Sequence, residues 1–217
     1  MTTLVCAAHA DDEVIGVGGT IAKLAKEGED VVVLVFFYGT GLAGRLFSWP
    51  PWISEEELTQ KRVEESKKAG KILGVKETIF VGMRGGGGDI EKEFTPEKKQ
   101  MILNIFKKYK PDKVFLHSIK DGHPEHRFVT RVVFDMIDVM DEKPEVFTYQ
   151  VNLFDFSEKD SKIIYDVSDT YKKKLKALKC FESQKISITG LEPMILLKGV
   201  HLGKKHNMKF AEYFYSR

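Results

Sequence analysis

The chain has 217 residues, with 34 Lys and Arg side chains against 32 Asp and Glu, so its formal net charge is only +2. A charge this small, with both signs interspersed, gives no electrostatic attraction toward nucleic acid or an acidic membrane surface. The length fits one sizeable domain covering residues 1–217, because no repeat, low-complexity tract or linker divides the sequence.

The two cysteines, Cys6 and Cys180, are too few for a disulfide framework, and Cys6 lies in an apolar run where a reduced, buried thiol is expected. The residues before His9 leave no room for a signal peptide, and no apolar stretch approaches the roughly 18 residues of a membrane span. We therefore expect a cytoplasmic protein without a membrane anchor.

Apolar runs alternate with amphipathic segments along the first half of the chain. Residues 3–8 form a continuous apolar run, which is typical of a strand covered on both faces, and a helix is predicted over 12–26. A second strand is predicted over 30–38. The capping box Ser54-Glu55-Glu56-Glu57 opens a helix that ends near Gly74, and residues 78–82 form the third predicted strand.

The second half continues the same alternation. Pro96 stands at the first position of a predicted helix, residues 113–117 form the fourth strand, and Pro124 opens a helix whose apolar residues keep a 3.6-residue period. Later strands are predicted over 146–151 and 163–167, and later helices over 169–184 and 191–202. This alternation predicts an α/β fold of three layers, in which helices cover both faces of a mostly parallel sheet.

Two short clusters combine histidine with acidic residues. Residues 8–13 read Ala-His-Ala-Asp-Asp-Glu, and residues 121–126 read Asp-Gly-His-Pro-Glu-His. Each cluster follows a predicted strand and opens a predicted helix. In parallel sheets, ligands bind beyond the carboxyl ends of the strands where the strand order reverses. If the first and fourth strands are neighbours at that point, the two clusters face each other across one crevice.

The residue types in these clusters indicate a metal site. Acidic residues at a helix start can simply complement the helix dipole, and a single histidine there is more often a surface residue than a ligand. Two such clusters after two parallel strands make a shared site the better interpretation. Imidazoles and carboxylates form a zinc ligand set with one carboxylate to spare for proton transfer, which indicates metal-assisted hydrolysis.

His9-Ala10-Asp11-Asp12-Glu13 resembles the AHPDDE signature of the LmbE/PIG-L-like deacetylases, and His123-Pro124-Glu125-His126 resembles their HPDH signature. Three further segments, 62–75, 166–184 and 209–214, are similar to later parts of the family pattern. This resemblance implies a Rossmann-like LmbE fold. It also implies an enzyme that removes an N-acetyl group from a small-molecule N-acetylglucosamine-type sugar or conjugate and releases acetate.

The resemblance also implies roles for particular residues. It implies three zinc ligands, His9, Asp12 and His126. Asp11 would be the general base, His123 would stabilise the oxyanion, and Arg62 would help to hold the sugar. Three protein ligands leave the fourth zinc position open for water, as catalytic zinc sites require. Asp11 would then take a proton from that water, and a protonated His123 would stabilise the oxyanion and later protonate the leaving amine.

The chain departs from the family pattern at several positions. Ala10 replaces the usual proline without removing a ligand, and Glu125 replaces the usual aspartate with a carboxylate one methylene longer. Leu42 stands where a glutamate is common, and Asp89, after four glycines, is the candidate for an aspartate expected after the third strand. The last two differences lie in substrate-facing segments. Side chains expected behind the metal site or at its rim are Glu125, Asp121, His117 and Asp89.

Three segments have more than one interpretation. Gly16 to Gly19 resemble a dinucleotide fingerprint but fall inside the first helix, where close packing against a strand is the better interpretation. Gly85 to Gly88 are interpreted as a rim loop rather than a phosphate cradle. Segment 41–52 is rich in aromatic residues and proline, and the sequence leaves open whether it stacks on sugars, packs against a neighbouring subunit or forms a lid.

The function favoured by the sequence is a zinc-dependent deacetylase acting on an amino sugar. The nearest alternative is a zinc amidase acting on a non-sugar N-acyl compound, and another divalent ion is an alternative to zinc. A sugar- or metal-binding protein without turnover is the third hypothesis. Asp11 and His123 argue against it, because binding alone needs neither a base nor an oxyanion donor. The sequence leaves open whether the chain forms a homo-oligomer.

Overall fold

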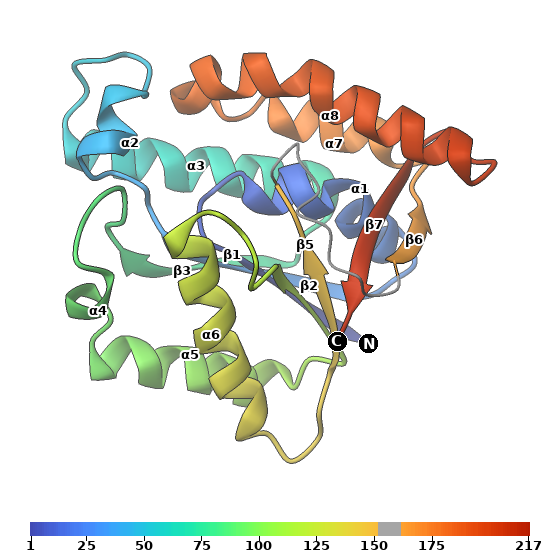
Figure 1. The fold of residues 1–217 in the computed structure, drawn as a ribbon. Coiled ribbons are helices and arrows are strands. Elements are labelled where there is room, and N and C mark those ends of the chain that lie inside the picture. The colour runs from blue at the N-terminus through green and yellow to red at the C-terminus, as the bar shows by residue number, and fades with distance from the viewer. Residues whose placement is uncertain (152–161) are drawn as a thin grey trace.

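The computed structural model describes residues 1–151 and 162–217. Within these ranges the strands form one seven-stranded sheet in the order β3-β2-β1-β4-β5-β7-β6 (Figure 1). The strands are β1 Thr2–Ala7, β2 Asp30–Phe37, β3 Glu77–Met83, β4 Lys113–His117, β5 Glu145–Tyr149, β6 Lys162–Asp166 and β7 Ala211–Ser216. The first five pair in parallel, which confirms the predicted α/β fold with a mostly parallel sheet.

Strand β1 lies at the point where the strand order reverses. Its residue Val5 pairs in parallel with Val33 of β2 on one side and with Phe115 of β4 on the other. The carboxyl ends of β1 and β4 therefore meet at one edge of the sheet, where α/β folds place their ligands. The two clusters that follow these strands are thus neighbours in space, as the sequence analysis required.

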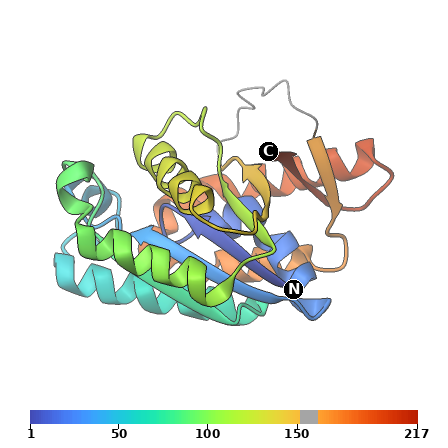
Figure 2. The same cartoon turned by 90° about the horizontal axis from the view of Figure 1, so that it is seen from below.

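Helices cover both faces of the sheet and complete the three layers (Figure 1, Figure 2). One face is covered by α1 Asp12–Lys26, α3 Glu55–Leu73 and α7 Tyr171–Leu178, with α8 Lys185–Lys205 lying against α7 and β7. The other face is covered by α5 Pro96–Tyr109 and α6 Pro124–Asp138. The remaining helices are the short α2 Leu42–Leu46, α4 Ile90–Glu93 and the 3-10 helix η1 Glu182–Gln184. None of the helices in the described ranges has the length and apolar character needed to cross a membrane.

The core is divided by the sheet into two apolar clusters. Because successive strand residues point to opposite faces, Val5 and Ala7 of β1 pack with α1, α3 and α7, whereas Leu4 and Cys6 pack with α5 and α6. Burial on both faces explains why β1 is apolar throughout. Strand β1, which is buried on both faces, therefore ends directly at the first histidine–carboxylate cluster.

The helix starts follow from the capping residues that the sequence predicts. The Ser54 side chain accepts a hydrogen bond from the Glu57 backbone N–H, and the Glu57 carboxylate accepts one from the Ser54 N–H, so the predicted capping box is formed. Pro124 lies in the first turn of α6, where a missing N–H costs no helical hydrogen bond, and His123 caps the helix. The two clusters consequently occupy the first turns of α1 and α6.

Small residues let α1 approach its neighbours closely. A Cβ atom at Gly16 would collide with the ring of Tyr149 in β5, and one at Gly19 would lie 3.0 Å from the Cβ atom of Val167. The interpretation of residues 16–19 as a packing surface is therefore confirmed.

Several elements differ from the sequence-based predictions, since the short helices α2 and α4 were not predicted and three longer elements have other bounds or another type. The helix predicted over 169–184 ends at Leu178, because the buried Phe181 leaves the helical conformation, with a ψ angle of 65°, before η1 begins. The helix predicted over 191–202 begins at Lys185 and continues through Pro193, since Ile188 and Ile195 on either side both pack into the core. No strand is predicted over 211–216, yet β7 lies there and pairs antiparallel with β5 and β6.

Candidate active site

Both predicted clusters line one open cleft at the carboxyl ends of β1 and β4. The cleft has a volume of about 720 Å³. Its walls come from the loops after β1 and β2, from the first turns of α1 and α6, and from the start of α8. The polar and charged side chains that line it include His9, Asp11, Asp12, Arg62, His123 and Glu125. Such convergence of titratable groups in one sizeable cleft is typical of an active site.

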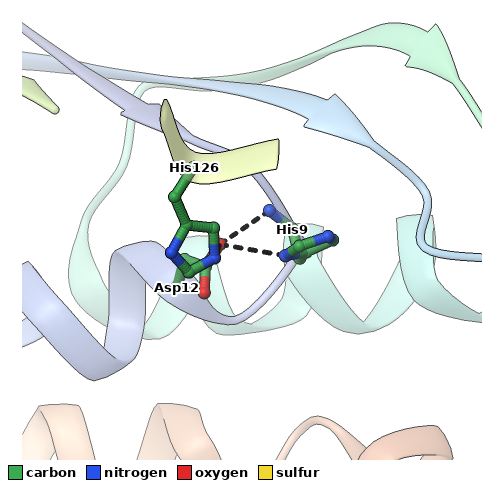
Figure 3. Close-up of side chains that lie close together, drawn as sticks. All are labelled: His9, Asp12 and His126. Atoms are coloured by element: carbon green, nitrogen blue, oxygen red, sulfur yellow. Dashed lines mark hydrogen bonds and ion pairs between the residues drawn. The ribbon is translucent and has the colours of Figure 1, made fainter. Parts of the chain in front are cut away.

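His9, Asp12 and His126 form a compact group that can hold a metal ion (Figure 3). One ligand atom from each lies within 4.8 Å of the others. The Oδ2 atom of Asp12 lies 3.3 Å from Nδ1 of His9 and 3.5 Å from Nε2 of His126. Two imidazoles and a carboxylate are a ligand set found in catalytic zinc sites. A second group, His9, His123 and Glu125, shares His9 with the first.

The remaining nitrogen of each ligand imidazole is held by another carboxylate. Nδ1 of His126 lies 3.1 Å from Oδ2 of Asp121, and Nε2 of His9 lies 2.5 Å from Oε2 of Glu125. Metal-binding histidines usually donate their second N–H to a carboxylate or carbonyl in this way, which fixes the ring and its tautomer. The arrangement around His9, Asp12 and His126 therefore fits a metal ion on chemical grounds.

The electrostatics of the group also favour a cation. Burial opposes charge on His9, but hydrogen bonds and charges from Asp12 and Glu125 outweigh it and raise the pKa of His9 to about 10. Burial likewise opposes charge on Asp12, yet the charges of His126 and His117 hold the pKa of Asp12 well below its usual range. An excess of negative charge that binds a proton so strongly also attracts a metal ion.

Asp11 lies in the same cleft but outside the group that can hold the metal. Its backbone N–H donates to the His9 carbonyl at 3.1 Å and to the Glu13 carboxylate at 3.1 Å. Burial and the neighbouring charge of Asp12 raise the pKa of Asp11 to about 7. A carboxylate with a pKa near neutrality can accept a proton and release it again at working pH.

His123 stands at the mouth of the cleft, and almost half of its side chain is exposed. Its Nδ1 atom accepts a hydrogen bond from the Glu125 N–H at 3.3 Å, so the proton of the neutral ring belongs on Nε2. Burial and the charge of His126 lower the pKa of His123. The lowered pKa favours the neutral ring, which donates through Nε2.

Arg62 of α3 forms part of the cleft wall. Its Nη1 atom donates to the carbonyls of Tyr38, at 2.7 Å, and Gly39, at 2.6 Å, so the loop directly after β2 holds the guanidinium in place. Burial lowers the pKa of Arg62, while the charges of Asp11 and Glu65 oppose that shift. Contact between Arg62 and a sugar stays a prediction.

The comparisons with known proteins agree with the site geometry described above. The family model for PIG-L, described as GlcNAc-PI de-N-acetylase, matches residues 4–137. The chain belongs to the PIG-L family. It is 30% identical to the diacetylchitobiose deacetylase of Thermococcus kodakarensis, over 94% of this chain and 78% of that protein.

Two solved structures share the PIG-L fold. The N,N'-diacetylchitobiose deacetylase of Pyrococcus horikoshii, complexed with its inhibitor, superposes with a TM-score of 0.79 at 24% identity, covering 100% of this chain and 83% of that one. The 4-carboxy-2-hydroxymuconate hydratase of Pseudomonas putida superposes with a TM-score of 0.79 at 20% identity, covering 99% and 95%. The fold thus also occurs in a hydratase, so the reaction has to be argued from the site.

Of the four residues expected behind the site or at its rim, three contact the group that can hold the metal and one lies away from it. Asp121 and Glu125 hold the two ligand imidazoles, as described above. His117 is fully buried behind the group and stacks on His126 with ring centroids 4.0 Å apart, while its Nε2 accepts from the Ala8 N–H. Asp89 is an exposed cap of α4, lies 3.0 Å from the Lys92 ammonium and does not line the cleft.

Contacts between distant segments support the site and are not visible in local sequence patterns. Gln184 donates to the carbonyl of Ala10 at 2.7 Å, which ties η1 to the loop that contains the ligands. Glu65 of α3 accepts from both the N–H and the hydroxyl of Ser183, at 2.7 and 2.5 Å. The resemblance to the family included both segments, and only the structure shows what these residues contact.

Proposed function

We propose that this chain is a zinc-dependent deacetylase that hydrolyses the N-acetyl group of an N-acetylglucosamine-type sugar or conjugate. The observation that supports this most strongly is that a group able to hold a metal ion and a separate carboxylate able to act as a base lie at one cleft. His9, Asp12 and His126 can hold a metal ion, and Asp11 remains free of that group as a base. Membership of the PIG-L family and the similarity to a diacetylchitobiose deacetylase support the same reaction.

When bound, a zinc ion would polarise the amide carbonyl and acidify a water molecule. Asp11 takes a proton from the attacking water, because its carboxylate lies in the cleft with a pKa raised to about 7 by burial and the charge of Asp12. The water oxygen first bonds to the carbonyl carbon, and the amide C–N bond then breaks as Asp11 passes the proton that it took from the water to the leaving nitrogen. The products are acetate and a free amine.

His123 stabilises the carbonyl oxygen as negative charge develops on it. Its Nδ1 atom accepts from the backbone, which leaves the Nε2 proton for a ligand at the mouth of the cleft. A donor held in place before the reaction stabilises the transition state more than the ground state. Arg62, which also lines the cleft, offers its remaining N–H groups to the sugar.

The proposal is tested by acetate release from a panel of N-acetyl amino sugars and non-sugar N-acyl compounds, with added zinc and with a chelator in parallel. We expect release from at least one amino sugar that the chelator abolishes and zinc restores. Release from the non-sugar compounds alone would favour an amidase instead. Release from neither class, in protein that carries stoichiometric metal, would contradict the proposed function.

A further inference from the structure

Helix α8 carries large apolar side chains on two opposite sides. Ile188 and Ile195 pack into the core, whereas Ile186, Met194 and Leu197 are exposed. With 3.6 residues per turn, the three exposed residues fall on one stripe along the helix, on the side turned away from Ile188 and Ile195. Figure 1 shows α8 as the outermost helix on its side of the sheet. We call this exposed row of residues the outer stripe of α8.

The outer stripe continues into a larger apolar patch. The Trp49 N–H donates to the Ser183 carbonyl at 2.8 Å, which joins segment 42–52 to the start of α8. Among the described residues, all exposed large apolar side chains except those of Met1 and Val139 belong to this segment or to α8: Leu42, Leu46, Phe47, Trp49, Trp52, Ile186, Met194, Leu196 and Leu197. We call these nine side chains the apolar patch.

The apolar patch is large enough to form a stable interface. Its nine side chains are 37–91% exposed. If a side chain of this size presents ~200 Å² when fully exposed, the patch has an area on the order of 1,000 Å². The largest apolar patch on a typical monomer covers roughly 300–600 Å², and each partner in a stable complex buries about 800 Å². The patch therefore has the size of an interface with another macromolecule.

Gly190 leaves a gap in the outer stripe of α8. A Cβ atom added at Gly190 would have no atom of the described chain within 4 Å, so a side chain from another molecule can approach the helix backbone closely there. Leu197 lies two helical turns further along the same stripe, ~10 Å away, and is 68% exposed. Helices pack by inserting the protruding side chains of one into the grooves of the other. The outer stripe therefore carries both halves of such a contact.

A two-fold axis across the middle of α8 brings these two halves together. If the axis passes between Pro193 and Met194, the helices of two copies run antiparallel, and Leu197 of each copy lies over Gly190 of the other. The same contact then forms twice, as in isologous interfaces, where one surface is complementary to itself.

Charge at the ends of α8 agrees with the same antiparallel arrangement. The exposed Glu182 lies just before the helix, and Lys204 and Lys205 are exposed in its last turn. About the same axis, Glu182 of one copy faces Lys205 of the other, so opposite charges meet at both ends of the contact. An acidic membrane surface would attract the lysines but repel Glu182, and it needs no gap at Gly190. These features together favour a second copy of the chain.

We propose that α8 forms the centre of a two-fold interface between two copies of this chain, in which Leu197 of each copy packs against Gly190 of the other. Ser187 and Leu191 of the same helix line the cleft, so the second copy lies beside the mouth of the cleft. The interface goes beyond the proposed function and does not depend on the reaction.

Light scattering coupled to gel filtration measures the mass of the full chain in wild type, Gly190→Leu, Leu197→Glu and the control Val139→Glu. Val139 is the matched control because it is an exposed apolar residue outside the apolar patch. We expect wild type to have twice the mass of one chain, or a larger even multiple. Gly190→Leu and Leu197→Glu each halve that mass, because every substitution occurs twice in a two-fold interface. Val139→Glu keeps the mass of wild type.

Gly190→Leu separates the interface from the fold. The space around Gly190 is open and leucine forms helices better than glycine, so we expect this variant to keep the circular dichroism spectrum of wild type. A double variant, Gly190→Leu with Leu197→Ala, exchanges the gap and the protruding side chain between the two positions. It restores the mass of wild type, which adhesion through exposed apolar surface in general would not do.

Several results would overturn the interface. Wild type with the mass of a single chain at every concentration tested contradicts it, and so does an oligomer whose mass neither single variant changes. Failure of the double variant to restore the mass would rule out the contact between Gly190 and Leu197. If wild type is monomeric and binds vesicles of phosphatidylcholine and phosphatidylglycerol, while Leu197→Glu does not, the apolar patch contacts a membrane instead. The proposed function stands or falls separately, by acetate release.

Discussion

The Oδ2 atom of Asp121 lies 3.1 Å from Nδ1 of His126, while Nε2 of the same ring lies 3.5 Å from Asp12. One imidazole is thus held between two carboxylates, of which Asp12 belongs to the group that can hold the metal and Asp121 does not. The Asp121 backbone is fixed in turn by a hydrogen bond from its N–H to the Ser118 carbonyl. Asp121 is therefore placed to orient His126 and to set its tautomer.

We predict that Asp121→Asn weakens metal binding by about 10- to 100-fold, because the amide orients His126 less well and does not raise its basicity. Competition with a zinc chelator of known affinity measures the effect. Asp89→Asn is the matched control, since Asp89 is also a loop aspartate near a helix start but lies outside the cleft. Equal metal affinity in Asp121→Asn and wild type would show that Asp121 has no role in the site.

His126→Ala is expected to abolish metal retention, because it removes one of the three ligands and leaves only His9 and Asp12 in the group. Elemental analysis after dialysis reports the metal content of the purified protein. His201→Ala, on the exposed surface of α8, serves as the comparison. A His126→Ala protein with the metal content of wild type would remove this residue from the ligand set.

A second test concerns stability away from the cleft. Glu212 of β7 lies 2.6 Å from the Lys174 ammonium, and its carboxylate also accepts from the N–H groups of Gly19 and Thr20. Both charged side chains are at most 5% exposed. Glu212→Gln leaves the ammonium buried without its counter-charge, which we expect to lower the free energy of unfolding by about 3 kcal/mol.

Urea denaturation monitored by circular dichroism measures that change. The control is Glu192→Gln, because Glu192 lies 3.8 Å from Lys179 in a pair whose lysine is 68% exposed. Exposed pairs contribute about 0–1 kcal/mol, so the control stays near wild type. If both variants lose the same small amount, the Lys174–Glu212 pair does not anchor β7 to α1 and α7.

Local patterns in the sequence predicted much of the site. The His9 and His126 clusters each lie within one strand–turn–helix unit, where residue spacing and capping determine which side chains face the cleft. The neighbouring positions of β1 and β4 had to be assumed, and the sheet order confirms the assumption. The same local reasoning correctly interpreted the capping box at Ser54 and the close packing at Gly16.

Interactions between distant segments could not be predicted in this way. Glu212 and Thr20 form a hydrogen bond although they are 192 residues apart in the sequence. Glu65 contacts Ser183 only because α3 and η1 pack together. Strand β7 is stabilised by pairing with β6 and β5, so the pattern of its own six residues is too weak to predict a strand. The position of Asp89 outside the cleft likewise depends on how the loop after β3 folds.

The measurement that tests the account most directly is paired metal content and acetate release in Asp11→Asn and Asp12→Asn. The two variants carry the same substitution at adjacent positions, so a difference between them separates the role of the base from the role of the metal ligand. We predict that Asp11→Asn retains the metal of wild type and loses roughly 10²- to 10⁴-fold in kcat, because an amide cannot accept the proton from water. Asp12→Asn loses the metal itself. An Asp11→Asn protein with full metal and full activity would contradict the proposed division of roles between the two aspartates.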